Sequence, residues 1–146
     1  MILEKVTANK KLIVENLILI WEDAVRKTHS FLKEENIEKL RPLVKLAIKN
    51  MQTLIIAKQK DDTIMGFIAL ENKKIEMFFI KPEYWKLGVD KALLLFAVEN
   101  YDVMWVDVNK QNVKALKFYE NMGFTVFSCF KTNNTAIVRM KWKEEK

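Results

Sequence analysis

Three short apolar runs follow one another between residues 53 and 80, and they limit the possible folds more than any other stretch. The runs cover residues 53–58, 63–71 and 74–80 and are rich in β-branched and aromatic residues. Such residues favour strands, and the polar segments between the runs have the composition of turns. The pattern predicts three strands in an antiparallel meander. Gly66 interrupts the second run and predicts a β-bulge there.

Helical patterns precede this meander. Residues 2–6 predict a short first strand, and apolar residues at helical spacing predict an amphipathic helix over residues 9–27. A second helical pattern covers residues 37–51. Pro42 lies inside it, and because proline lacks a backbone N–H we predict a break or kink near Arg41.

The elements after the meander alternate between helix and strand. The complete order β-α-α-β-β-β-α-β-α-β-β predicts an α/β (α+β) fold in a single domain, residues 1–146. Its central sheet is expected to be mixed, mostly antiparallel and flanked by helices. The later predicted elements are a helix after Asp90, a strand over 102–108, a helix over 112–122 closed by Gly123, and a hairpin of strands 124–130 and 135–142.

Composition limits the partners. The chain has a formal net charge of +6 and a single cysteine, Cys129, which we expect to be buried in a strand and inert. Its basic residues are spread along the chain without a nucleic-acid-binding motif, so a nucleic-acid partner is not expected. No apolar segment is long enough to span a bilayer and the start does not resemble a signal peptide, so we expect a cytoplasmic protein without a membrane partner. No metal site is predicted.

The segment VNKQNVKALKFYENMGF, residues 108–124, matches a known pattern. It resembles the later half of the GNAT N-acetyltransferases, V-x-x-x-N-x-x-A-x-x-F-Y-x-x-x-G-F, and the element order over the whole chain agrees. Residues 23–35 also resemble the small stand-alone bacterial type of this family called YjaB. The resemblance implies the GNAT acyl-CoA N-acyltransferase fold. It also implies direct transfer of the acetyl group from acetyl-CoA, as co-substrate, to a primary amine.

The same resemblance implies where coenzyme A lies. The pantetheine arm is expected where the strand ending at Ile80 diverges from the strand over residues 102–108, with a backbone N–H there polarising the thioester carbonyl. The pyrophosphate is expected at the following loop, at the start of a helix. Asn112 is either a helix N-cap, a cofactor contact or both. The implied cofactor-binding residues are Phe78, Phe79, Ile80, Trp85, Lys86, Leu87, Gly88, Val89, Asp90, Lys91, Asn109, Asn112 and Phe118.

The loop departs from the family pattern Q/R-x-x-G-x-G/A at two of its six positions. Trp85 replaces the polar first residue and Asp90 replaces the small last one. A carboxylate about 4 Å from a phosphate costs roughly 1–4 kcal/mol, depending on burial. Alternatively Asp90 turns away and caps the helix, and Lys86 and Lys91 supply offsetting charge. We predict that the loop binds coenzyme A more weakly than an intact one.

Three residues are catalytic candidates. Tyr119 is the expected proton donor to the leaving thiolate, with a core aromatic as the alternative. Glu76 is the expected base; alternation places it on a face with Lys74 and Phe78, and the alternative is a surface acid paired with a lysine. His29, between the two early helices, either titrates at the acceptor side or is structural.

Two functions follow from these residues. The first is an acetyl-CoA-dependent N-acetyltransferase whose acceptor is a small-molecule or peptide amine. The second is a non-catalytic protein of the same fold that binds a ligand or partner and has weakened or lost its coenzyme A binding. The chain is expected to be a monomer or a homodimer.

Overall fold

The predicted order of elements is confirmed in the computed structural model, which describes residues 1–28 and 33–143. A short 3-10 helix, η1, is added after the fourth strand. The elements are β1 (Ile2–Lys5), α1 (Lys10–Thr28), α2 (Glu34–Lys49), β2 (Thr53–Lys58), β3 (Ile64–Glu71), β4 (Lys74–Ile80), η1 (Pro82–Tyr84), α3 (Val89–Tyr101), β5 (Trp105–Asn109), α4 (Val113–Met122), β6 (Phe124–Thr132) and β7 (Thr135–Trp142).

The strands form one seven-stranded sheet in the order β1-β2-β3-β4-β5-β7-β6. Every neighbouring pair is antiparallel except β4 and β5, which are parallel. The mixed, mostly antiparallel sheet is therefore confirmed. A register shift in the β2–β3 pairing leaves one extra residue, Met65, beside Gly66, so the predicted bulge is also confirmed.

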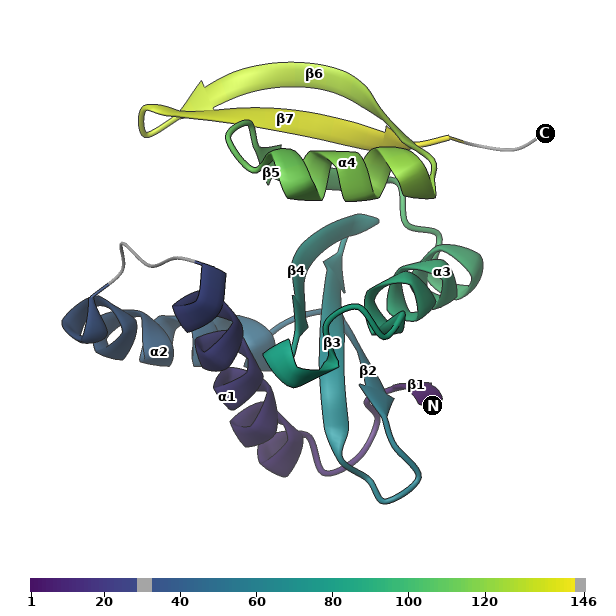
Figure 1. Ribbon diagram of the computed structural model, residues 1–146. Coiled ribbons are helices and arrows are strands. Elements are labelled where there is room, and N and C mark those ends of the chain that lie inside the picture. The colour runs from purple at the N-terminus through teal and green to yellow at the C-terminus, as the bar shows by residue number, and fades with distance from the viewer. Residues whose placement is uncertain (29–32, 144–146) are drawn as a thin grey trace.

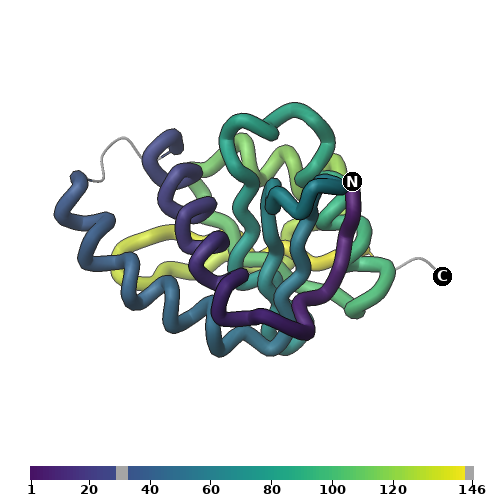
Figure 2. Tube along the Cα trace, turned by 90° about the horizontal axis from the view of Figure 1, so that it is seen from below, coloured from purple at the N-terminus to yellow at the C-terminus, as the bar shows by residue number. Residues whose placement is uncertain are grey.

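Helices cover the two faces of the sheet unequally. In both views α1 and α2 lie on one side of strands β2–β4, and α3 lies on the other (Figure 1, Figure 2). Apolar residues of α1 and α2 pack on Leu54, Ile56 and Phe67. On the opposite face, α3 and Tyr119 of α4 join an apolar cluster that runs from Ile55 of β2 to β7. The part of the sheet from β5 to β6 is covered by α4 on that face only (Figure 1).

Two tight turns set the register of the hairpins. Asn72 and Lys73 connect β3 to β4 with φ of 51° and 67°, and Asn133 and Asn134 connect β6 to β7 with φ of 48° and 64°. Two successive residues with positive φ characterise the type I′ turn, whose twist matches that of paired strands. Asparagine tolerates this conformation better than most residues, which explains the turn chosen at 133–134.

The prediction of a break near Arg41 is wrong, because α2 runs continuously through Pro42. Proline removes one hydrogen bond of the helix. Contacts with α1 hold the segment in place: the Nε of Arg41 donates to Glu22 Oε1 at 2.6 Å, and Ile37 and Ile48 are buried. Tertiary packing therefore outweighs the local preference.

The prediction for Cys129 is also wrong, because its thiol is exposed. Cys129 lies in β6, which is the last strand of the sheet and has only β7 beside it. A register shift at Phe127 further bends this strand. Most residues of β6 are consequently exposed to solvent.

Candidate active site

The strands β4 and β5 separate soon after they meet. They pair at only two positions, Lys74 with Trp105 and Ile75 with Val106. Beyond Ile75 the two strands share no further pairs, so the rest of β4 has no neighbour on that side. The predicted divergence of these strands is confirmed, and it leaves backbone groups of β4 available to a ligand.

The pairing of β4 with β3 identifies those groups. Lys81, just after β4, donates its N–H to the carbonyl of Met65 at 2.8 Å. In an antiparallel ladder every second residue bonds to the same neighbour, so Phe79 also bonds toward β3. Phe78 and Ile80 therefore direct their N–H and C=O groups into the gap. Of the three predicted arm-binding positions, these two have the required backbone orientation.

Glu76 is the extra residue of a β-bulge in β4. Ala69 pairs with Met77 and Leu70 pairs with Ile75, which leaves Glu76 without an opposite residue on β3. A bulge bends its strand and redirects the following side chains. The bulge lies where β4 leaves β5, so it contributes to the opening of the gap.

The bulge also changes the predicted alternation. Lys74 and Glu76 lie on one side, with Lys74 Nζ 3.5 Å from Glu76 Oε2. Phe78 lies on the other side, in the cluster of α3 and α4, with its ring centroid 6.1 Å from that of Phe118. The prediction that Phe78 shares a face with Glu76 is therefore wrong, because the extra residue shifts the pattern by one position.

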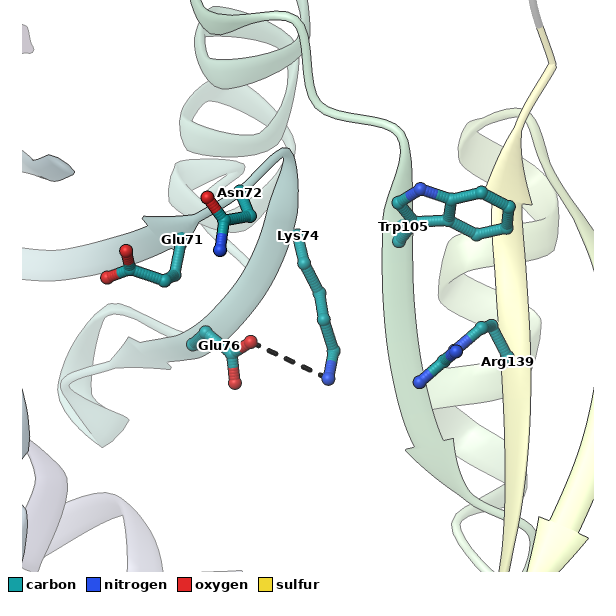
Figure 3. Close-up of a pocket in the computed structure, with 6 residues that line it drawn as sticks. All are labelled: Glu71, Asn72, Lys74, Glu76, Trp105 and Arg139. Carbon is teal, nitrogen blue, oxygen red and sulfur yellow. Dashed lines mark ion pairs between the residues drawn. The ribbon is translucent and has the colours of Figure 1, made fainter. Parts of the chain in front are cut away.

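A small open pocket lies beside Glu76, on the face that α4 does not cover. Its volume is about 210 Å³. Figure 3 shows the side chains of Lys74 and Arg139 pointing toward each other across this pocket, with Trp105 beside them. The pocket is lined by Glu71, Asn72, Lys74, Glu76, Trp105 and Arg139.

Asp107 forms ion pairs with the two cationic side chains of this pocket, Lys74 and Arg139. Arg139 donates to its two carboxylate oxygens from Nε at 2.8 Å and from a terminal nitrogen at 3.0 Å. Lys74 Nζ lies 2.9 Å from the same carboxylate. The hydrogen bond from Arg139, and secondly that from Lys74, lowers the pKa of Asp107 below its ordinary value. Lys74 thus bridges Asp107 and Glu76 across the separating strands.

Tyr119 lies on the other face, in α4. The residue is 7% exposed, and its ring contacts the rings of Phe118 and Phe124. Burial raises the pKa of its hydroxyl well above the ordinary value. Among the described residues none is hydrogen-bonded to this hydroxyl, yet no fully enclosed side-chain oxygen or nitrogen there lacks a partner. The hydroxyl oxygen therefore reaches accessible space from a buried ring.

The loop after β4 forms the start of α3. Gly88 is the N-cap of that helix in the left-handed conformation, with φ of 82°. No heavy atom lies within 4 Å of the position where a Cβ would stand, so the space above Gly88 is open. Lys86, Leu87 and Lys91 are exposed, whereas Val89 is 2% exposed and belongs to the core.

The two departures from the family pattern each satisfy a backbone group. Trp85 folds back and donates its indole Nε1–H to the carbonyl of Ile80 at 2.8 Å. Asp90 accepts a hydrogen bond from the backbone N–H of Lys91 at 2.8 Å. Asp90 lies in the first turn of α3, where Gly88 is the N-cap, so its carboxylate stays at the start of the helix. Whether it weakens coenzyme A binding stays a prediction.

Asn112 and Asn109 shape the start of α4. The side chain of Asn112 accepts from the N–H of Ala115 at 3.1 Å, so the N-cap prediction is confirmed. Asn109 accepts from the N–H of Gln111 at 2.9 Å, and its carbonyl accepts from Asn112 at the same distance. The remaining catalytic candidate, His29, lies outside the described residues.

The pairing of Glu76 with Lys74 matches the alternative that the sequence offered for this acid. Asp107 and Arg139 line or border the same pocket and were not predicted from the sequence. Asp107 and Arg139 face each other only because β7 pairs with β5, and that register depends on the whole sheet. The opposite charges on two apolar strands are the one available signal, but they do not identify partners. The hydrogen bond of Trp85 was likewise not predictable, since it depends on how the loop folds back.

The fold and site define a class. A sheet whose central parallel pair opens beside the glycine-capped start of a helix is the arrangement of acyl-CoA-dependent N-acyltransferases, to which the sequence pattern had pointed. The family model of the acetyltransferase (GNAT) domain matches residues 22–144. The chain belongs to this family.

Similar proteins agree with this assignment. The peptidyl-lysine N-acetyltransferase YjaB of Escherichia coli (strain K12) is 30% identical over 112 residues, which cover 77% of this chain and 76% of that protein. The solution structure of apo-form YjaB from Escherichia coli has a TM-score of 0.80 at 25% identity, over 97% of this chain and 98% of that one. The PaiA N-acetyltransferase of Thermoplasma acidophilum, in complex with coenzyme A, shares the fold at a TM-score of 0.70 and 22% identity, over 97% and 100% of the two chains.

The chain is therefore an N-acetyltransferase that uses acetyl-CoA as co-substrate and an amine as acceptor. Within residues 1–28 and 33–143 no cluster of histidine, cysteine, aspartate and glutamate side chains has the arrangement of a metal site. None of the helices described is both long enough and apolar enough to cross a bilayer.

Proposed function

We propose that the enzyme acetylates the ε-amine of lysine in a peptide, with Glu76 as the base and Tyr119 as the acid. The observation that carries the proposal is the gap between β4 and β5. Along its wall, the backbone groups of Phe78 and Ile80 are not paired with another strand. The side chain of Glu76 lines a pocket on one face of the sheet, and Tyr119 packs on the opposite face. Groups on both sides of the gap can thus act on one thioester.

The shape of the pocket beside Glu76 favours a lysine side chain. Pockets that enclose a whole small ligand usually exceed about 300 Å³. The pocket here has about 210 Å³ and is open, which suits one extended side chain whose main chain stays outside. Beyond it Phe127 is 60% exposed and its ring lies 4.9 Å from that of Trp105, so aromatic surface is available to neighbouring residues of a peptide. The relative YjaB is named a peptidyl-lysine N-acetyltransferase, which supports the same acceptor.

The proposed reaction is direct, through a ternary complex. Glu76 accepts a proton from the lysine ammonium, and the neutral nitrogen attacks the thioester carbon. The N–H of Phe78 stabilises the oxyanion that forms on the carbonyl oxygen. The carbon–sulfur bond then breaks, and Tyr119 gives its proton to the departing thiolate. Tyr119 is protonated at neutral pH, as this role requires. The acetylated nitrogen loses its second proton through solvent, which reprotonates Tyr119, and Glu76 releases the first proton to solvent.

The proposed position of acetyl-CoA follows the same groups. The amides of its pantetheine arm pair with Phe78 and Ile80, and Phe118 borders the arm because its ring contacts Phe78. The open space above Gly88 and the first N–H groups of α3 receive the pyrophosphate. Lys86 and Lys91 are exposed beside it and supply positive charge. Phe79 and Val89 contribute through packing, while Asn109 and Asn112 shape the far wall of the gap.

The test is release of coenzyme A thiol with a lysine peptide as acceptor. Wild-type protein should acetylate this peptide faster than the matched peptide with arginine in place of lysine, and faster than spermidine. Glu76→Gln should lower kcat at neutral pH by about 10²-fold. Activity of this variant should recover as the pH approaches the pKa of lysine, about 10.4, because the acceptor then loses its proton to solvent. Unchanged activity of Glu76→Gln at neutral pH would exclude Glu76 as the base.

Cytoplasmic location and the choice between monomer and homodimer stay predictions. Sedimentation of the purified chain would decide the latter. The family assignment and the acetyltransferase relatives favour the catalytic hypothesis over the non-catalytic alternative.

A further inference from the structure

The geometry points to a lock formed by Trp85 and Asp90, which together determine how tightly the enzyme holds acetyl-CoA. In this structure each side chain occupies a backbone group that the co-substrate would use, and both must release before the cleft is filled. This inference rests on the proposed position of acetyl-CoA and adds to it the residues that control its affinity.

The side chain of Trp85 occupies a hydrogen-bond acceptor that the pantetheine arm of acetyl-CoA would use. Ile80 directs its carbonyl into the gap, since Lys81 and Phe79 bond toward β3. That carbonyl already accepts the indole Nε1–H of Trp85 at 2.8 Å. An amide of the pantetheine arm would need the same oxygen from the same side. The indole therefore occupies the proposed position of the pantetheine arm, and its N–H forms the hydrogen bond that an amide of the arm would form.

The side chain of Asp90 occupies a backbone N–H that the pyrophosphate of acetyl-CoA would use. The first N–H groups of a helix have no partner within the helix and form its anion site. Here the N–H of Lys91 is already bonded to the carboxylate of Asp90 at 2.8 Å, and the N–H of Ala92 bonds to Gly88. A pyrophosphate must displace this internal carboxylate as well as tolerate its charge.

Two features of the loop between η1 and α3 would allow it to adopt a second conformation. Lys86, directly after Trp85, has φ of 68°, a left-handed conformation that is unfavourable for a non-glycine residue. Release of the indole would allow this residue to relax. Trp85 is 38% exposed and borders an open pocket of about 660 Å³ between α1 and η1, so its ring is not enclosed by the core. The other residues that line this pocket are Asp23, Arg26, Lys27, Pro82 and Glu83.

The lock lowers apparent affinity by reducing the fraction of enzyme that is ready to bind. It should therefore slow association and leave dissociation unchanged, because the bound state has already lost both internal bonds. Neutral hydrogen bonds in proteins contribute about 0.5–1.5 kcal/mol, which corresponds to a factor of about two to ten in the dissociation constant. The lock also favours ligands that carry both an amide arm and a pyrophosphate, since neither part alone frees the whole cleft.

The experiment combines binding of coenzyme A with a direct view of the indole. Association and dissociation rates are measured by stopped flow for wild type, Trp85→Phe, Asp90→Asn and Asp90→Ala. Trp142→Phe serves as the matched control, because Trp142 packs on Phe124 at the far end of α4. In wild-type protein, proton–nitrogen spectra follow the side-chain N–H of Trp85, with those of Trp21, Trp105 and Trp142 as internal references. Thermal unfolding of each variant verifies that it is folded.

Trp85→Phe should bind coenzyme A about two- to tenfold more tightly, through faster association. Asp90→Ala should bind more tightly than Asp90→Asn, because asparagine keeps an oxygen that can cap Lys91 while alanine removes both oxygen and charge. The indole N–H of Trp85 should exchange slowly in the free protein and shift on addition of coenzyme A.

An indole signal that stays unchanged at saturating coenzyme A, or weaker binding by Trp85→Phe, would overturn the lock while leaving the proposed function intact. Failure of wild type and of every variant to bind coenzyme A would overturn both the lock and the proposed position of the co-substrate.

Discussion

Tyr119 joins a buried ring to a hydroxyl that is free of hydrogen bonds to the described residues. A buried tyrosine usually finds a partner for its O–H. The ring of Phe118 contacts both Tyr119 and Phe78, so it connects Tyr119 to the wall of the gap. The family motif identified this residue from the sequence. Its burial required the structure, since it depends on how α4 packs against Phe124.

Tyr119→Phe tests this role. The variant keeps the ring contacts, so the free energy of unfolding and the dissociation constant of coenzyme A should change little. Loss of the proton donor should lower kcat by about 10²-fold in the thiol-release assay. Because burial raises the pKa of Tyr119, the wild-type rate should show no loss of this acid below about pH 10. An unchanged kcat in the phenylalanine variant would mean that another group protonates the thiolate.

Gly66 shows how one position in β3 supports the wall of the cleft. A Cβ built at Gly66 would lie 2.6 Å from Ile80 Cδ1 and 2.9 Å from the carbonyl oxygen of Phe79. The second of these atoms is backbone and cannot move without displacing the end of β4. The glycine therefore allows β4 to approach β3 at the place where Ile80 presents its carbonyl to the gap.

Gly66→Ala should destabilise the fold by about 1–3 kcal/mol, as overpacking of a well-filled core does. It should also weaken coenzyme A binding through the displacement of Ile80. Urea unfolding measures the first effect and calorimetry the second. Alanine in place of the exposed Lys60 gives a matched control in the β2–β3 turn. A Gly66→Ala protein as stable as wild type would show that the strands can separate without cost.

Asp107 links three strands through Arg139 and Lys74. These partners lower its pKa in the folded state below the unfolded value of 3.8. The stabilisation is therefore complete above the unfolded pKa and is lost as the pH falls through the lower, folded pKa. Asp107→Asn should be less stable than wild type at neutral pH, and the difference should shrink at about pH 2. Urea unfolding at both pH values measures it; a difference that is independent of pH would contradict the linkage.

The sequence predicted the elements well where local patterns decide them. The meander, the final hairpin and the N-cap at Asn112 depend on strand alternation, paired asparagines and a short-range hydrogen bond. It failed where distant packing decides: α2 continues through Pro42 because α1 holds it, and Cys129 is exposed because β6 is an edge strand. The same limit applies to the site. The family pattern pointed to the loop and Tyr119 and strand alternation pointed to Glu76, and their roles stay predictions. The contacts of Trp85 and the register of Asp107 required the assembled sheet.

Acetyl-CoA should act on the stability of the whole molecule, because its proposed position touches both sides of the gap. At a concentration one hundred times its dissociation constant, a ligand that binds only the folded state adds about 2.7 kcal/mol. For a chain of this size the melting temperature should rise by about 5–10 °C. Differential scanning fluorimetry measures this shift, with pantetheine as the control that lacks the phosphates. No shift at saturating acetyl-CoA would contradict binding to the native fold.

The two-pair contact between β4 and β5 has a use in protein engineering. A chain divided after Asp102, which is exposed, leaves β1–β4 with α3 in one fragment and β5–β7 with α4 in the other. Each fragment keeps its own hairpins intact, and their association depends on the apolar cluster they share. Acetyl-CoA would bridge the divided halves and increase their reassembly, so a reporter attached to each fragment would convert acetyl-CoA concentration into a signal.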